Sequence, residues 1–182
     1  AEGVWKQSEH QLGTTQKYLT DNNNKAAGST ANALEGESSE INVHIPLIMT
    51  AKEGIAYMGD NKGKVNAKGT TTAVNYGAII GFARNQGKVE ILGQVEAIDK
   101  NTTSEANKYK NIAAFAESGG EVNVRGKVTI NGIGAFAKGA NSKAQLLSGT
   151  DVINAGTVGG MVATDHGYAR LDGGTINITK DN

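Results

Sequence analysis

Residues 77–93 read GAIIGFARNQGKVEILG, residues 111–126 read NIAAFAESGGEVNVRG, and residues 131–149 read NGIGAFAKGANSKAQLLSG. These stretches share one order of residue types: small apolar residues, Phe, Ala, a polar turn, and then alternating apolar residues. All three phenylalanines of the chain occupy the same place in that order: Phe82, Phe115 and Phe136. The chain therefore contains an internal repeat of about two dozen residues, which restricts the fold to repetitive architectures.

Five copies of the repeat align through three anchors: a turn residue, an apolar pair that begins two positions later, and a corner residue four positions after the start of that pair. The turn residues are Gly63, Gly87, Gly120, Ser142 and Gly167, the pairs are Val65/Ala67, Val89/Ile91, Val122/Val124, Ala144/Leu146 and Ala169/Leu171, and the corner residues are Gly69, Gly93, Gly126, Ser148 and Gly173. The Phe position is filled by Tyr57 or Met58 in the first copy and by Met161 in the last.

The spacing of the apolar residues indicates strands. Apolar residues recur at every second position, whereas amphipathic helices need spacings of three and four. The 25 glycines among 182 residues would weaken helices but suit tight corners. We therefore expect an all-β solenoid of about five to six coils. Equivalent residues of stacked coils lie above one another, which predicts an internal row of Phe82, Phe115 and Phe136, extended by Met58 and Met161.

Two regions depart from the repeat. Residues 1–36 are polar, with only sparse apolar anchors, and we expect an irregular N-terminal region that forms a cap or, preferably, an incomplete coil. Residues 37–182 are assigned to the coils. Residues 99–110, DKNTTSEANKYK, lengthen the second copy and are expected to form a loop inserted between two strands. Insertions in solenoids project from one edge of the stack, where binding surfaces are often built.

Composition excludes several classes of partner. Eighteen basic and 18 acidic residues cancel, so no long-range field favours nucleic acid or an anionic membrane. Cysteine is absent, which rules out disulfides and thiolate chemistry. No apolar run approaches the roughly 20 residues of a membrane span, so we expect no membrane insertion by this chain. The chain opens without Met and without a signal-peptide pattern, and we expect it to be a piece of a larger protein.

The search for chemical motifs predicts no catalytic residue, no cofactor and no metal site. The three histidines, His10, His44 and His166, are far apart in the sequence. His166 aligns with turn residues of other copies, and His44 is expected to point outward beside Asn42. The segment beginning at Asp21 lacks the glycine and glutamate that a calcium loop requires, and G-G-x-G-x-D repeats are missing.

The outward positions of the strands were considered as a site for a polysaccharide-cleaving β-helix. They carry mixed charges with no acidic pair repeated from coil to coil, as metal-assisted cleavage would need. A solvated face with cross-strand pairs such as Lys88 and Glu121 is the favoured interpretation. The outward residues are Lys64, Asn66, Lys88, Glu90, Glu121, Asn123, Arg125, Tyr168, Arg170, Asp172, Asn177 and Thr179.

The segments GGEVNVRGKVTI (119–130), GIGAFAKGA (132–140) and GGTINIT (173–179) resemble the degenerate repeats of type V secreted autotransporter passengers, particularly large fusobacterial ones. The resemblance covers about residues 40–182 and lies in the style of the repeat. It implies a right-handed parallel β-helix, exported through the outer membrane to the cell surface. No catalytic triad of the serine-protease passengers can be placed on this chain.

These observations predict a non-enzymatic segment of a surface adhesin or a rigid display stalk. Its partner would be a host or bacterial surface protein or glycan, and exposed coil ends could associate end to end. The alternative is a carbohydrate-binding or polysaccharide-cleaving β-helix. If the chain binds a partner, the insertion is the expected site, with Tyr109 as aromatic anchor and Lys100, Lys108 and Lys110 as charged contacts.

Overall fold

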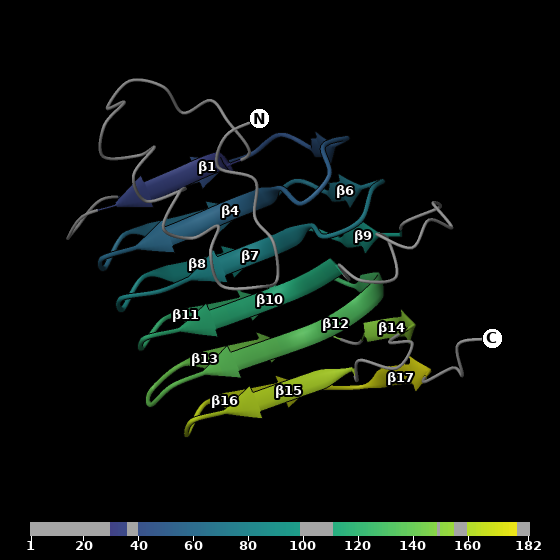
Figure 1. Ribbon diagram of the computed structural model, residues 1–182. Helices are drawn as coiled ribbons and strands as arrows, with labels where there is room; N and C mark the ends of the chain where they lie inside the picture. The colour runs from purple at the N-terminus through teal and green to yellow at the C-terminus, as the bar shows by residue number, and fades with distance from the viewer. Residues whose placement is uncertain (1–29, 36–39, 99–110, 149, 155–159, 178–182) are drawn as a thin grey trace.

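The computed structural model describes residues 30–35, 40–98, 111–148, 150–154 and 160–177, and every regular element in these ranges is a β-strand. Figure 1 shows the strands stacked as successive rungs, and all of the pairings between rungs are parallel. The predicted all-β parallel β-helix is confirmed. Six of the strands form a separate sheet, so five turns of the solenoid lie between the first and the last of them.

Each coil contributes one strand to each of three sheets. Sheet A contains β1 (Thr30–Glu35), β4 (Ile55–Asp60), β7 (Ile79–Ala83), β10 (Asn111–Glu117), the second part of β12 (Val128–Lys138) and β15 (Met161–Thr164). Sheet B contains β2 (Glu40–Val43), β5 (Lys64–Ala67), β8 (Lys88–Ile91), β11 (Glu121–Val124), β13 (Lys143–Leu146) and β16 (Tyr168–Leu171). Sheet C contains β3 (Leu47–Met49), β6 (Thr71–Ala73), β9 (Val95–Ala97), the first part of β12, β14 (Thr150–Asn154) and β17 (Gly174–Asn177).

Strand β12 passes through the corner between sheets C and A without a break, so it belongs to both. Strand β1 lies inside the range 1–36 that we assigned to the N-terminal region. It pairs in parallel with β4, from Thr30 opposite Ile55 to Glu35 opposite Asp60. Residues 30–35 therefore contribute the sheet A strand of the first described coil. Residues 1–29 and 36 lie outside the described part.

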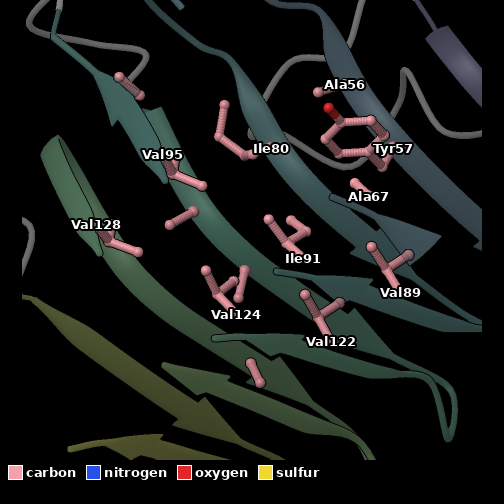
Figure 2. Close-up of a cluster of buried hydrophobic side chains, with 14 of the residues drawn as sticks. Ala56, Tyr57, Ala67, Ile80, Val89, Ile91, Val95, Val122, Val124 and Val128 are labelled. Atoms are coloured by element: carbon pink, nitrogen blue, oxygen red, sulfur yellow. The ribbon is translucent and has the colours of Figure 1, made fainter. Parts of the chain in front are cut away.

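The interior is filled by the alternating apolar residues of all three sheets. Figure 2 shows Val89, Ile91, Val122 and Val124 of sheet B beside Ile80 of sheet A. The predicted apolar pairs of the first four copies are at most 1% exposed. Ala169 and Leu171 in the last coil are only half-buried, because no described coil covers them from below. The predicted apolar pairs of the first four copies are thus confirmed as core residues, and the fifth pair packs against them.

The phenylalanines stack in register, as predicted. Phe115 lies opposite Phe82 on one side and Phe136 on the other, with ring centroids 5.1 and 4.9 Å apart. Met58 extends the row at one end. At the other end the residue opposite Phe136 is Val162, whereas Met161 lies opposite Ala135. The assignment of Met161 to this row was wrong because it was based on side-chain size. The register shows that Ala163 pairs with Ala137, which places Val162 opposite Phe136.

The prediction that this row is internal was also wrong. A methyl group added at Gly81 would meet Val122 Cγ1 at 2.7 Å, so position 81 faces the interior, and Ile80 also belongs to the interior cluster. Two consecutive inward positions break the alternation and turn Phe82 to the outside. The phenylalanines form a second cluster made only of sheet A residues, which we call the outer stripe: Ile55, Met58, Ile79, Phe82, Ile112, Phe115, Ile133, Phe136 and Val162.

Tight turns carry the chain from sheet A to sheet B. In the first, Asn61 and Lys62 have φ values of 47° and 66°, and the Gly63 amide donates to the Asp60 carbonyl over 2.8 Å. Asp165 and His166 adopt the same left-handed conformation, with φ values of 50° and 68°. Asn and Asp tolerate this conformation better than most residues, which explains the polar composition of these turns. The interpretation of His166 as a turn residue is confirmed.

Candidate functional site

The predicted contact residues Lys100, Lys108, Tyr109 and Lys110 lie outside the described residues. The structure does describe the two points where the insertion leaves and rejoins the solenoid. The chain departs after Ala97, the last residue of β9 in sheet C, and returns at Asn111, the first residue of β10 in sheet A (Figure 1). The insertion therefore starts at the corner between these two sheets.

Asn111 ties the two ends of the insertion together. Its side chain is buried, its Nδ2 donates to the Ala97 carbonyl over 3.2 Å, and its Oδ1 accepts from the Ala78 amide over 2.8 Å. These bonds satisfy the amide group inside the protein, where an unpaired polar atom would be costly. The base of the insertion is thus fixed to the preceding coil, at its start beside β7 and at its end in β9. Sequence reasoning missed Asn111, although an asparagine where another copy has Gly132 was a usable signal.

The outer face of sheet B carries a hydrogen-bonded polar network that joins three successive coils. Its centre is Glu90, whose side chain is 13% exposed. Oε1 of Glu90 accepts from Asn123 Nδ2 over 2.8 Å and lies 3.3 Å from Lys88 Nζ, and Oε2 accepts from Arg125 Nε over 3.1 Å. Lys88 and Glu121 are directly opposite in register, as expected, but the ion pair that Lys88 forms is with Glu90.

The same network continues along the stack. Asn123 Oδ1 accepts from Gln145 Nε2 over 2.7 Å in the next coil. In the other direction a separate group spans the two preceding coils: Asn66 lies opposite Glu90, and its Nδ2 donates to Glu40 and Asn42. Many of the donors and acceptors on this face therefore satisfy one another, which is typical of a stabilised, solvated sheet surface.

Burial raises the pKa of Glu90, but hydrogen bonds from Asn123, Lys88 and Arg125 favour the carboxylate more strongly, and the net pKa lies below its ordinary value of 4.5. A carboxylate with a lowered folded-state pKa stabilises the fold above that ordinary value. The stabilisation is lost as the pH falls through the lowered folded-state pKa.

We expect Glu90→Gln to lower the free energy of unfolding by about 1 kcal/mol at pH 7, because charge-assisted hydrogen bonds become neutral ones. The difference from the unsubstituted protein should shrink as the pH falls below 4.5. Urea unfolding followed by circular dichroism at pH 7 and at acidic pH measures both. Glu96→Gln, at an exposed position on β9, is the control and should have little effect. A difference that stays constant with pH would contradict this assignment.

Of the two described histidines, His44 lies between β2 and β3 of the first coil and His166 lies between β15 and β16 of the last. His44 is exposed, as is Asn42, in agreement with the prediction, and His166 lies in its turn. His10 lies outside the described residues. Among the residues with described positions, no group of three or more His, Asp or Glu side chains could hold a metal ion. The same part of the chain has no helix long and apolar enough to cross a membrane.

Comparisons with protein families, with curated proteins and with solved structures found no match to this chain. The properties that bear on function are therefore those of the molecule itself: a stacked solenoid, a self-paired polar face on sheet B, and an insertion with a fixed base.

Proposed function

We propose that this chain is a non-enzymatic segment of a bacterial autotransporter passenger, displayed at the cell surface, that acts in adhesion or as a rigid display stalk. The single observation that supports this most is the solenoid with a fixed insertion base: Asn111 donates to the Ala97 carbonyl and accepts from the Ala78 amide, so the scaffold holds the point where the insertion rejoins it. Rigid scaffolds that present loops are a common arrangement for binding.

The solenoid also suits the role mechanically. Each coil contacts its neighbours, so coils can fold in succession as the chain leaves a pore, and the stack resists bending. Five turns at about 4.8 Å extend the protein by about 24 Å. The partner would be a surface protein or glycan of a host or bacterial cell, and the open strand edges of the first and last coils would allow end-to-end association.

Binding of the purified protein to cells and to a glycan array tests the proposal. Deletion of residues 101–108 should reduce binding at least tenfold, because it removes Lys108 and most of the segment that carries the other expected contacts, Lys100, Tyr109 and Lys110, and leaves Asn111 in place. Lys143→Ala, an exposed change on sheet B, should leave binding unchanged. Circular dichroism must show that both variants remain folded.

Three results would change or overturn the proposal. Cell adherence that survives the deletion unchanged would remove the insertion from the site. No binding by the folded protein would leave only the stalk role. Release of unsaturated products from uronate-containing polymers would replace both roles with the polysaccharide-cleaving alternative.

A further inference from the structure

Exposed apolar side chains gather on one side of the solenoid. Among the described residues, the large apolar side chains that are exposed are Ile45, Ile48, Val74, Leu92 and Tyr168. The first four lie on sheet C or at one of its corners, in the first three coils, whereas Tyr168 lies on sheet B in the last coil. Ile45 and Ile48 are each 70% exposed. A single exposed apolar residue is ordinary, but a group of them marks an interaction surface.

Three apolar side chains on this side are direct neighbours. Backbone hydrogen bonds place Val74 and Ile98 at equivalent positions of successive coils. Ile48 lies opposite Thr72, two positions before Val74, which makes Ile48 the diagonal neighbour of Val74. Side chains of this length reach a diagonal neighbour. We call Ile48, Val74 and Ile98 the sheet C patch. It begins at the base of the insertion, because Ile98 is the last described residue before it.

Basic residues surround the sheet C patch. In the first four coils, the exposed charged side chains described on sheet C and its two corners are Lys52, Lys68, Arg125 and Lys127, which are basic, and Glu96, which is acidic. The complete chain has 18 basic and 18 acidic residues, so this excess is local. Arg125 also bonds Glu90 of sheet B, but the other basic residues still outnumber Glu96. An apolar centre with a polar rim is the usual arrangement of a protein interface.

We propose that the sheet C patch binds an acidic protein segment that carries apolar side chains. This inference rests on the proposed adhesive role and extends the binding surface from the insertion onto the solenoid. Aliphatic side chains gain free energy from apolar partner groups, which a peptide supplies and a glycan largely lacks. The ring of Tyr76 at this corner is 6% exposed, with Lys52 Nζ 5.3 Å from its centroid, so it offers no open face to a sugar. The basic rim favours acidic residues in the partner and speeds association.

Fluorescence anisotropy of labelled synthetic peptides tests the inference directly. The probes are a peptide of Glu and Leu, a matched peptide of Lys and Leu, and polyglutamate. The Glu/Leu peptide should bind the full chain at least about tenfold more tightly than either of the others, because it alone supplies both apolar groups and negative charge. Its binding should weaken as the salt concentration rises.

Variants of exposed residues locate the binding surface. Ile48→Ser combined with Val74→Ser should weaken binding of the Glu/Leu peptide by about tenfold, because the apolar centre is lost. Lys68→Glu should weaken binding and reduce its salt dependence, since it reverses a charge of the rim. Tyr168→Ser is the matched control, an exposed apolar residue at the other end of the solenoid, and should leave binding unchanged. Circular dichroism must show that all variants remain folded.

Three results of the peptide assay would overturn the inference. These are equal affinity for the Glu/Leu and Lys/Leu peptides, affinity that the double variant does not change, and competition by heparin that the double variant leaves intact. The last result would assign this side of the solenoid to an anionic glycan.

Cell adherence separates this inference from the proposed function, because the double variant keeps the insertion and the deletion of residues 101–108 keeps the sheet C patch. Adherence that is lost with the deletion but unchanged in the double variant would remove the patch from the binding surface and leave the proposed function standing. Adherence that is lost in the double variant but unchanged after the deletion would support the patch and remove the insertion.

Discussion

Replacing Gly126 with alanine is expected to destabilise the solenoid by about 3 kcal/mol, a cost typical of severe overpacking. Gly126 is the corner residue between sheets B and C, and an added Cβ would lie 2.0 Å from the Gly93 carbonyl oxygen of the coil above. The two backbones cannot move apart here, because hydrogen bonds join the coils on both sides of the corner. Arg125 N donates to the Ile91 carbonyl over 2.7 Å, and Val95 N donates to the Lys127 carbonyl over 2.8 Å.

Urea unfolding at neutral pH, followed by circular dichroism, measures this effect. Gly93→Ala should behave similarly, since its Cβ would lie 2.0 Å from the Gly69 carbonyl oxygen. Ser148→Ala is the matched control at the same corner of the next coil, where the chain already carries an exposed side chain. The stacking is also less regular near that corner, because the pairing of β12 with β14 shifts register after Val128. Equal stability of Gly126→Ala and the unsubstituted protein would show that the corners can separate.

Asp60→Ala is expected to cost about 3–4 kcal/mol, because it leaves the guanidinium of Arg84 buried without its counterion. Asp60 accepts from Arg84 Nε over 2.8 Å, from Asn85 Nδ2 over 2.8 Å and from the Asn61 amide over 2.8 Å. Arg84 Nη2 lies 2.8 Å from the same carboxylate, and the two side chains are 10% and 1% exposed. One carboxylate therefore stabilises the turns of two successive coils.

Denaturation at pH 7 tests this prediction, with Arg170→Ala as control. Arg170 also pairs with an aspartate, Asp172, but side chains of this pair are 49% and 39% exposed, so its loss should matter far less. The double variant Asp60→Leu with Arg84→Met should recover much of the stability, because both charges are then removed together. If the double variant is as unstable as Asp60→Ala, the loss comes from packing and the role assigned to the ion pair is wrong.

Glu117 lies next to Arg84 along the same outward row of sheet A. Burial raises the pKa of Glu117, the positive charges of Arg84 and Lys138 lower it, and the negative charge of Asp60 raises it, so that the net pKa lies above its ordinary value. A raised folded-state pKa favours the protonated form, so this group opposes folding more as the pH rises past its ordinary value. The row thus combines Asp60, whose carboxylate accepts several hydrogen bonds, with Glu117, whose charged form is disfavoured by burial.

Much of the candidate site could be anticipated from the repeat. The insertion at 99–110 is visible as extra length between two anchors, and its position between strands of different sheets follows from counting along the coil. Asn111 could not be assigned a role, because its partners, Ala78 and Ala97, are 33 and 14 residues away and meet it only once the coils are stacked.

The sequence by itself determined the all-β solenoid, the order of its strands, the turns at Gly63 and Gly167, and the stacking of Phe82 on Phe115. These features follow from a local pattern of period two and from a repeat that places like residues above one another. Only the tertiary structure decided that the phenylalanines face outward, that Val162 ends their row, and that Asp60 pairs with Arg84. The reason is that two consecutive inward residues, such as Ile80 and Gly81, reverse the alternation. The repeat shows which residues are equivalent in successive coils, but it does not show which face of the sheet they occupy.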